Sequence, residues 1–495
     1  MNYVSTRDKS VKVTAAEAIA RGISAEGGLF VPDTFKTLQR DDFENLKKLD
    51  YIGRAKYVLK SFLNDFTDEE IDYCVKGAYS GSFDDEKPAP VVKVGDMNVM
   101  ELWHGPTCAF KDLALQLLPY LLTTSAKKTA QGKKTVILVA TSGDTGKAAL
   151  EGFCDVPDTE IIVFYPCDGV SPMQKLQMDS QKGSNVHVFA IKGNFDDAQT
   201  GVKKIFTDST VKQKLEDNGM QFSSANSINW GRLAPQIVYY VSAYCDMINR
   251  GDDLTDGFNV AVPTGNFGNI LAAYYAGKMG VPINKLICAS NSNNVLTDFI
   301  RTGVYDRNRK FFTTVSPSMD ILISSNLERM LFELSGCDDK AVAEMQAQLA
   351  KTGVFSVSDE IKTEMSEIFW GGCCDDNATL ETIGETFKKQ GYLCDTHTAV
   401  AVNVYNQYKT ATGDLRPAVI ASTASPYKFA DSVLESVSDK KTDSEFGNVR
   451  LLSEITDTQI PSPIKALENA VVRFKDVVSK DEMPSAVYSA LLING

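Results

Sequence analysis

A lysine at position 111 stands where amine chemistry is favoured. Gly105-Pro106 indicates a turn and an apolar run begins at Leu113, so Lys111 falls in the first turn of a predicted helix. A cation at the positive end of a helix and beside apolar side chains should have a lowered pKa, which favours the neutral amine needed to form a Schiff base. The segment alone is more typical of a surface lysine at a helix start.

A second segment has the features of a phosphate-binding loop between a buried strand and a helix. Its residues are Gly265, Asn266, Phe267, Gly268 and Asn269. Glycines let the backbone approach a phosphate, and the free N–H groups at the start of the following helix favour an anion. The loop lacks the lysine of nucleoside-triphosphate loops and the third glycine of the dinucleotide fingerprint. A tight turn without a ligand would have the same pattern.

A third segment also joins a predicted strand to a predicted helix. Its candidate ligand-binding residues are Ser142, Gly143, Asp144, Thr145 and Lys147. The hydroxyls and backbone donors suit a carboxylate or a phosphate, and Lys147 adds positive charge. A helix cap at Asp144 or Thr145 is the alternative. Both loops would lie at the carboxyl ends of strands, where open α/β sheets bind ligands.

Two further positions could contact an anionic or aromatic ligand. Small polar side chains precede Arg232 in the segment 223–232, and this arginine could clamp an anion with two hydrogen bonds. Thr423 follows a predicted strand at 418–421, so its hydroxyl could face a ligand ring. A structural polar turn and a strand-end cap are the respective alternatives.

The elements that must position these residues indicate an α/β fold. Strand, glycine-bearing loop, helix and strand follow one another at 135–165 and again at 258–289, the pattern of parallel sheets with crossover helices. Further strands are expected at 186–191 and 418–421. The chain therefore has either two sheets or one sheet with a large inserted lobe.

Composition excludes several classes of protein. The net charge of −13 repels nucleic acid and anionic membranes, and no stretch approaches the roughly 18 apolar residues that span a bilayer. Arg7, Asp8 and Lys9 interrupt any apolar signal segment, so the cytoplasm is the expected compartment. The cysteines and histidines show no metal-ligand spacing, and we expect no metal. Spacing does not decide whether His104 or His397 reaches the site.

Taken together, these stretches resemble the threonine synthase family, in its longer bacterial and fungal branch, a fold type II group of pyridoxal-5′-phosphate (PLP) enzymes. The stretches that carry the likeness are Gly22–Pro32, His104–Lys111, Thr141–Lys147, Asn226–Gln236, Pro263–Asn269, Pro317–Asn326 and Asp395–Val400. The chain departs from the family pattern at Ser425–Phe429 and at Thr396.

The resemblance implies two open α/β lobes with the cofactor between them. We expect an amino-terminal region at 1–85 and a catalytic region at 86–440, in which a smaller lobe at about 130–225 is inserted in the larger one. A carboxy-terminal segment at 441–495 is expected to close on the larger lobe.

The activity that the resemblance implies is conversion of O-phospho-L-homoserine and water into L-threonine and phosphate, by a monomer or homodimer. Lys111 matches the family's PLP lysine, the Gly265–Asn269 loop its cofactor-phosphate cradle, and Thr423 the hydroxyl beside the pyridine nitrogen. We expect Ser142–Thr145 to hold the substrate carboxylate. Arg232, with Lys147, is expected to hold the substrate phosphate.

Two other functions would use part of the same pattern. A PLP enzyme that eliminates or replaces the β substituent of serine or cysteine derivatives needs Lys111 and the glycine loop but has less need of Arg232. A non-catalytic protein that binds a phosphorylated metabolite would explain both anion-binding loops without amine chemistry.

Overall fold

The larger lobe of the computed structural model is built on a six-stranded sheet. The structure describes residues 1–129, 133–141, 143–167 and 170–493. The strands, in spatial order, are β14 (Phe369–Cys373), β11 (Ile283–Ser290), β10 (Phe258–Pro263), β15 (Ala418–Ser422), β5 (Met97–Glu101) and β4 (Val91–Val94). Only β4 runs antiparallel to its neighbour. Every residue of β10 is buried, as expected of a central parallel strand covered on both faces.

Helices cover both faces of this sheet. Alternate residues point to opposite faces. On one face Ala261 and Ile420 pack with residues of α18 (Thr396–Thr412). On the other, Val260 and Val419 belong to the main core, with α11 (Trp230–Arg250) and α12 (Gly268–Lys278). The carboxyl ends of β10 and β15 therefore open between packed helices, which is where the glycine loop and Thr423 lie.

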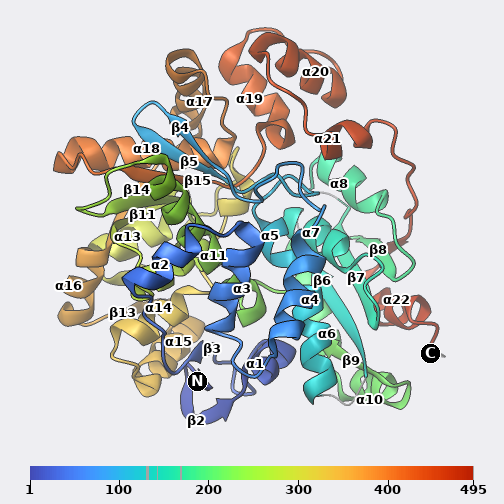
Figure 1. Ribbon diagram of the computed structural model, residues 1–495. Coiled ribbons are helices and arrows are strands. Elements are labelled where there is room, and N and C mark those ends of the chain that lie inside the picture. The colour runs from blue at the N-terminus through green and yellow to red at the C-terminus, as the bar shows by residue number, and fades with distance from the viewer. Residues whose placement is uncertain (130–132, 142, 168–169, 494–495) are drawn as a thin grey trace.

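The smaller lobe has its own parallel sheet beside the first (Figure 1). Its strands, in spatial order, are β16 (Val477–Val478), β8 (Val186–Ile191), β7 (Thr159–Pro166), β6 (Lys134–Ala140) and β9 (Met220–Ser223). Four of the five strands come from one continuous stretch inserted between β5 and β10 of the larger lobe. Two open α/β sheets confirm the predicted fold class.

The remaining helices and short strands connect and cover the two sheets. The helices are α5 (Lys111–Leu115), α6 (Leu118–Thr129), α7 (Asp144–Phe153), α8 (Pro172–Asp179), α9 (Phe195–Thr207), α10 (Ser209–Asp217), α13 (Val295–Thr302), α14 (Leu327–Leu334), α15 (Asp339–Thr352), α16 (Asp359–Ile368), α17 (Asp376–Gln390), α19 (Ala430–Val437), α20 (Glu445–Thr456), α21 (Ser462–Leu467) and α22 (Met483–Ala490). β12 (Val304–Asp306) pairs antiparallel with β13 (Val354–Ser356), and 3-10 turns occur at η1 (Pro317–Met319), η2 (Pro426–Phe429) and η3 (Lys480–Glu482).

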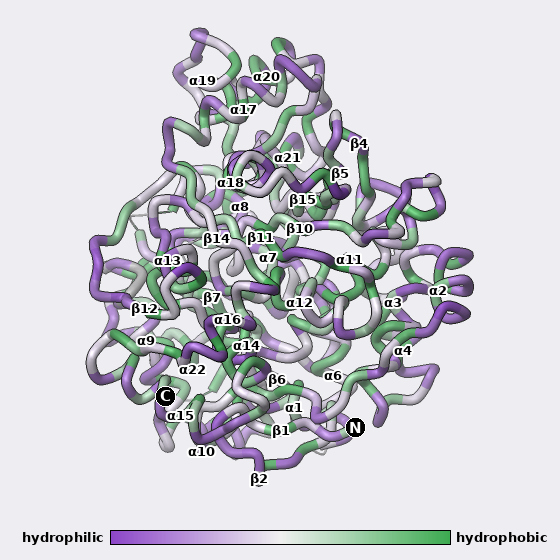
Figure 2. The backbone as a smooth tube through the Cα atoms, turned by 90° about the vertical axis from the view of Figure 1, so that its left-hand side faces the viewer, coloured by the Kyte–Doolittle hydropathy of each residue, from purple (hydrophilic) through white to green (hydrophobic). Residues whose placement is uncertain are grey.

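The amino-terminal region shares the main hydrophobic core. Its sheet has the order β2 (Asp8–Val13), β1 (Tyr3–Ser5) and β3 (Phe30–Pro32), and its helices are α1 (Ala15–Arg21), α2 (Arg40–Leu46), α3 (Tyr51–Lys60) and α4 (Asp68–Tyr79). Buried Arg54 of α3 pairs with Asp246 of α11 at 2.7 Å. This region is thus packed onto α11, while outlying elements such as β2 and α2 are largely hydrophilic (Figure 2).

The carboxy-terminal segment contacts both lobes. Leu452 of α20 and Ile464 of α21 pack with α19 over the larger lobe. β16 instead adds a strand to the smaller sheet, and Met483 and Val487 of α22 pack in the core of that lobe. The expectation that residues 441–495 close on the larger lobe is therefore wrong for β16 and α22. Among the described residues, no helix is both long and apolar enough to cross a membrane.

Close packing of α7 against α5 depends on Gly152. A Cβ at this position would lie 2.0 Å from the backbone carbonyl oxygen of Leu115, at the end of α5. We predict that Gly152→Ala lowers the free energy of unfolding by about 1–3 kcal/mol because backbone must move. Gly277→Ala, in α12 with no atom within 4 Å of the new Cβ, should raise it by about 0.5–1 kcal/mol. Urea denaturation measures both, and equal effects would contradict the packing argument.

Candidate active site

Lys111 lies at the centre of a buried polar cluster between the two lobes. It is the first residue of α5, and the preceding amide, Phe110 N–H, donates to the carbonyl of Thr423 at 2.8 Å. The Lys111 Nζ is 3.4 Å from the Ser318 Oγ and 3.7 Å from the Asp144 Oδ2. Burial lowers the pKa of Lys111, and the nearby charges of Lys428 and Arg232 lower it further against the opposing effect of Asp144. The amine is therefore biased towards its neutral, nucleophilic form.

Asp144, the first residue of α7, forms a buried ion pair with Lys428. Its Oδ1 is 2.8 Å from the Lys428 Nζ, and it also accepts a hydrogen bond from Gln174 at 3.1 Å. Burial alone would raise the pKa of Asp144, but Lys428 and Lys111 hold it well below its usual range. Lys428, only 1% exposed in its side chain, donates further to the carbonyl of Thr107 at 2.9 Å. A carboxylate so paired cannot itself bind the carboxylate of a substrate.

At the start of α12, the backbone of the glycine loop packs closely against Ser318. A Cβ on Gly265 would lie 2.9 Å from the carbonyl oxygen of Ser318, and Phe267 adopts a left-handed conformation with φ of 62°. The loop is fixed by Ser324, whose hydroxyl donates to the Gly265 carbonyl at 2.7 Å. The buried Asn269 Nδ2 has no partner among the described residues. Free donors at a helix start suit the phosphate of PLP.

Arg232 is a buried cation without a paired acid. It lies in the first turn of α11, is 4% exposed, and donates to the carbonyl of Ala225 at 2.9 Å. No carboxylate of the described residues lies within 4.0 Å of it, and its Nε is buried without a partner. Burial lowers the pKa of Arg232 to about 10. A desolvated guanidinium of this kind favours an anionic ligand.

Only some of the other predicted substrate-binding residues lie beside the polar cluster around Lys111. Gly143 lies at the start of α7 beside Asp144, and its amide donates to the Thr141 hydroxyl at 3.0 Å. Thr145 is in the same helical turn. Lys147 pairs with Glu151 at 2.9 Å, and no hydrogen bond or ion pair in the described chain joins it to Lys111, Asp144 or Arg232. Ser142 lies outside the described residues.

Thr423 lies directly after β15, beside the segment that carries Lys111. The isolated bridge between Ala109 and Ala424 and the hydrogen bond from Phe110 join these two stretches. The side chain of Thr423 is nearly buried, and its hydroxyl forms no hydrogen bond with any residue that the structure describes. It is thus free to bond a ring nitrogen of a ligand next to Lys111.

Sequence reasoning gave no role to two residues near Lys111, Lys428 and Ser318, and left open whether His397 reaches the site. Lys428 was visible only as a lysine between two aromatic residues in a turn after a strand. Ser318 and His397 lie in stretches that resemble the family, but spacing gave them no role. Ser318 contacts Lys111 and Asp144, and its amide donates to the His397 Nε2 at 3.1 Å.

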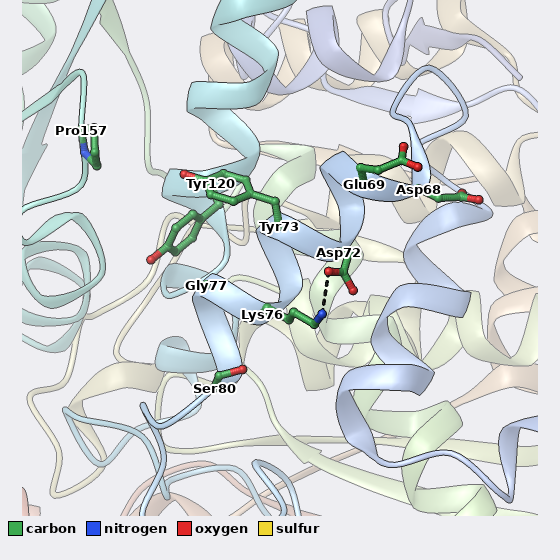
Figure 3. Close-up of a pocket in the computed structure, with 9 residues that line it drawn as sticks. All are labelled: Asp68, Glu69, Asp72, Tyr73, Lys76, Gly77, Ser80, Tyr120 and Pro157. Carbon is green, nitrogen blue, oxygen red and sulfur yellow. Dashed lines mark ion pairs between the residues drawn. The ribbon is translucent and has the colours of Figure 1, made fainter.

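A surface hollow elsewhere does not contain this chemistry. It lies between α4 and α6, has a volume of about 970 Å³, and is lined by residues such as Tyr73, Tyr120 and Pro157 (Figure 3). Its Lys76 is paired with Asp72 at 2.8 Å. None of the predicted site residues lines it.

Comparison with known families agrees with this geometry. A family model described as "Pyridoxal-phosphate dependent enzyme" matches residues 85–357, more than half of the chain, so the chain is a member of this class of enzymes. Models described as "Threonine synthase N terminus" and "Threonine synthase, C-terminal" match residues 2–79 and 398–487. The chain belongs to the threonine synthase family, which confirms the predicted resemblance and the predicted cofactor.

Individual relatives cover nearly the whole chain. Threonine synthase of Pseudomonas aeruginosa is 37% identical over 88% of this chain and 90% of its own length. The crystal structure of PLP-bound threonine synthase from Brucella melitensis has a TM-score of 0.89 at 34% identity, covering 100% of both chains. Threonine synthase-like 1 of Macaca fascicularis is 40% identical over 89% of this chain, and this chain spans 61% of that protein's length.

The buried pair of Asp144 and Lys428 predicts a large loss of stability when one partner is removed. We expect Lys428→Met to lower the free energy of unfolding of the cofactor-free protein by about 3 kcal/mol, because Asp144 would lose its closest counterion. Lys409→Met, which removes an exposed pair with Asp96, should cost less than about 1 kcal/mol. Asp144→Asn combined with Lys428→Met should recover part of the loss. Equal costs for the two lysines in urea denaturation would contradict a tightly paired Asp144.

His104 gives a separate prediction about pH. Its Nδ1 is 2.9 Å from Asp84 and its Nε2 is 2.9 Å from Glu101. Burial would lower the pKa of His104, but the two carboxylates raise it to about 9. Because this exceeds the unfolded value of about 6.5, the stabilisation is complete below about pH 6.5 and is lost as pH rises to about 9.

The stability difference between the wild type and His104→Asn measures this effect. Urea denaturation at a series of pH values should show a constant difference below about pH 6.5 that shrinks steadily up to about pH 9. A difference independent of pH over this range would show that His104 is not held as a cation.

Proposed function

We propose that this chain converts O-phospho-L-homoserine and water into L-threonine and phosphate. The observation that carries the proposal is Arg232, a buried arginine whose Nε has no partner and which pairs with no carboxylate among the residues that the structure describes. A substrate with a second anionic group accounts for this arginine in an otherwise acidic protein. We further propose that the chain acts on this small molecule in the cytoplasm as a monomer or homodimer, without a nucleic acid or membrane partner.

The residues of the site fit PLP. The Gly265–Asn269 loop and the amides at the start of α12 would hold its phosphate, and Lys111 would hold its aldehyde carbon. The Thr423 hydroxyl would face the pyridine nitrogen. A neutral hydroxyl at that position, in place of a carboxylate, would leave the nitrogen largely unprotonated. When bound, PLP supplies an electron sink for a carbanion at the substrate's α carbon.

Lys111 is positioned to move protons for this substrate. Once the substrate's amine has replaced it, the released Lys111 amine acts as a base and removes the α proton, since burial lowers its pKa and so favours the neutral amine. Loss of a β proton then allows phosphate to leave from the γ carbon. Water adds at the β carbon, and return of protons to the γ and α carbons gives threonine. When Lys111 takes up a proton, its positive charge is stabilised by the ionised Asp144, whose Oδ2 lies 3.7 Å from the Lys111 Nζ.

The two anionic groups of the substrate would bind at different places, one at backbone amides and the other at Arg232. Because the Asp144 side chain is occupied by Lys428, we assign the α-carboxylate to the backbone amides at the start of α7 together with the hydroxyls of Ser142 and Thr145. Arg232 would take the substrate phosphate with bidentate hydrogen bonds. Lys147, already paired with Glu151, would contribute through its charge at most.

The direct test is release of phosphate from O-phospho-L-homoserine, with threonine identified as the second product. The PLP-loaded wild type should form both in equal amounts. Lys111→Ala should abolish turnover and the absorbance of the bound cofactor at roughly 410–420 nm, the usual range for a lysine-linked cofactor. A Lys111 variant that kept both would overturn the assignment, and phosphate release without threonine would point to another elimination.

Arg232 is tested by its effect on substrate affinity. Arg232→Leu should raise the KM for O-phospho-L-homoserine about a hundredfold because a charge-assisted pair with the phosphate is lost. The affinity for PLP, titrated by absorbance, should change much less. If the affinity for PLP fell while the KM stayed the same, Arg232 would belong to the cofactor site and another residue would bind the substrate phosphate.

A further inference from the structure

Ser318 joins the two lobes at the proposed catalytic amine. The residue lies in the turn η1, outside both sheets, yet its side chain contacts Lys111 at 3.4 Å and Asp144 at 3.3 Å. Its carbonyl oxygen fills the space that a side chain at Gly265 would need. One small residue thus contacts the amine, the buried carboxylate and the phosphate loop.

The direction of the hydrogen bonds through Ser318 is fixed by chemistry. Asp144 is held ionised by Lys428, so its Oδ2 can only accept and the Ser318 hydroxyl must donate to it. The lone pairs of the Ser318 oxygen then accept from a Lys111 N–H. A neutral Lys111 that donates one N–H to Ser318 has a restricted orientation, and its own lone pair is left for the reacting carbon.

The backbone of Ser318 is held in turn by His397. This histidine, at the start of α18, is 2% exposed and accepts the Ser318 amide proton at its Nε2, 3.1 Å away. Its Nδ1 is 2.8 Å from the Oδ2 of Asp395, which is fully buried. Since an amide can only donate, Nε2 must carry the lone pair and Nδ1 the proton. Asp395 therefore selects the tautomer that can hold Ser318.

This arrangement differs from that of a hydrolytic serine. In a nucleophilic serine site the imidazole bonds the serine oxygen and removes its proton. Here the imidazole bonds the Ser318 amide, and the hydroxyl is directed to Asp144 and Lys111 instead. The arrangement of Asp395, His397 and Ser318 therefore fixes the position of the Ser318 hydroxyl. It does not activate that hydroxyl as a nucleophile.

We propose that Ser318 orients the Lys111 amine, and that His397 and Asp395 are positioning residues that hold Ser318 in place. This inference rests on the proposed role of Lys111 as the PLP lysine. The chain of contacts runs from Asp395 through His397 and Ser318 to Lys111. Its effect is on how fast the lysine can attack a carbonyl or remove a proton, and not on how tightly the substrate's anionic groups are bound.

The test uses full-length protein freed of PLP and then supplied with PLP alone. The rate of cofactor uptake, followed by absorbance at roughly 410–420 nm, reports formation of the lysine linkage without any turnover. Ser318→Ala should slow this rate about tenfold, the size of one ordinary hydrogen bond. In the reloaded enzyme kcat should fall by a similar factor while the KM stays within about twofold. Ser366→Ala, which removes an exposed hydroxyl that donates to the carbonyl of Thr363 in the same helix, is the matched control.

His397 is tested by two amides that differ in reach. Gln places a polar atom near the position of Nε2, so His397→Gln can still accept from Ser318 and should stay within about threefold of the wild type in uptake rate. Asn reaches only as far as Nδ1, so His397→Asn should resemble Ser318→Ala. His187 lies in β8 and is paired with Glu160, and His187→Gln is the control for replacing a histidine by glutamine.

Three results would overturn the inference. The first is an uptake rate for Ser318→Ala equal to that of Ser366→Ala. The second is an equal loss in His397→Asn and His397→Gln, and the third is failure of His397→Gln to fold while His187→Gln folds. Failure of the wild type to take up PLP, or linkage in Lys111→Ala, would instead contradict the proposed function itself.

Discussion

A buried ion pair between Lys428 and Asp144 fixes the arrangement of the site. Two charges removed from water are costly unless each is paired and its remaining hydrogen-bonding groups are satisfied. Here Lys428 also donates to Thr107, while Asp144 also accepts from Gln174 and Ser318. Asp144 begins a helix of the smaller lobe and Lys428 lies in a turn of the larger one. The pair therefore joins the lobes beside Lys111 and keeps a negative charge near an amine whose pKa is lowered by burial.

The glycine loop is also linked to the amino-terminal region, through Arg329 of α14. Fully buried Arg329 donates to the carbonyl of Phe30 at 3.0 Å and to that of Ile228 at 2.6 Å, and it also bonds the side chain of Asn326. Asn326 in turn donates to the carbonyl of Asn266 in the loop. One hydrogen-bonded unit thus includes a strand of the amino-terminal sheet, the segment before Arg232 and the glycine loop. The amino-terminal region shares the main core for this reason.

Local chemistry made part of this site predictable. Lys111 and the glycine loop were predicted from features within a few residues of each, namely glycines, helix starts and apolar runs. The structure places Lys111 at the start of α5 and the glycine loop between β10 and α12. Lys428, Ser318 and His397 could not be identified in this way, because their roles depend on partners far away in the sequence. Ser318, for example, is separated from Lys111 by 207 residues.

Two features of the structure could not be expected from the local sequence, for the same physical reason. Asp144 stands in a predicted anion-binding turn, but its side chain pairs with Lys428, which lies far away in the sequence. β16 has only two residues, too few for any periodic pattern, so the return of the chain to the smaller lobe was not visible. In both cases a tertiary contact decided what the local sequence left open.

The most direct test of the account is to find which lysine carries the cofactor. Borohydride reduction of the PLP-loaded protein fixes the cofactor to its lysine, and mass spectrometry of the digested chain locates the added mass. The account predicts a single modified peptide with the cofactor on Lys111. Modification at Lys428, Lys147 or any other lysine, or the absence of a modified peptide from protein that binds PLP, would contradict it.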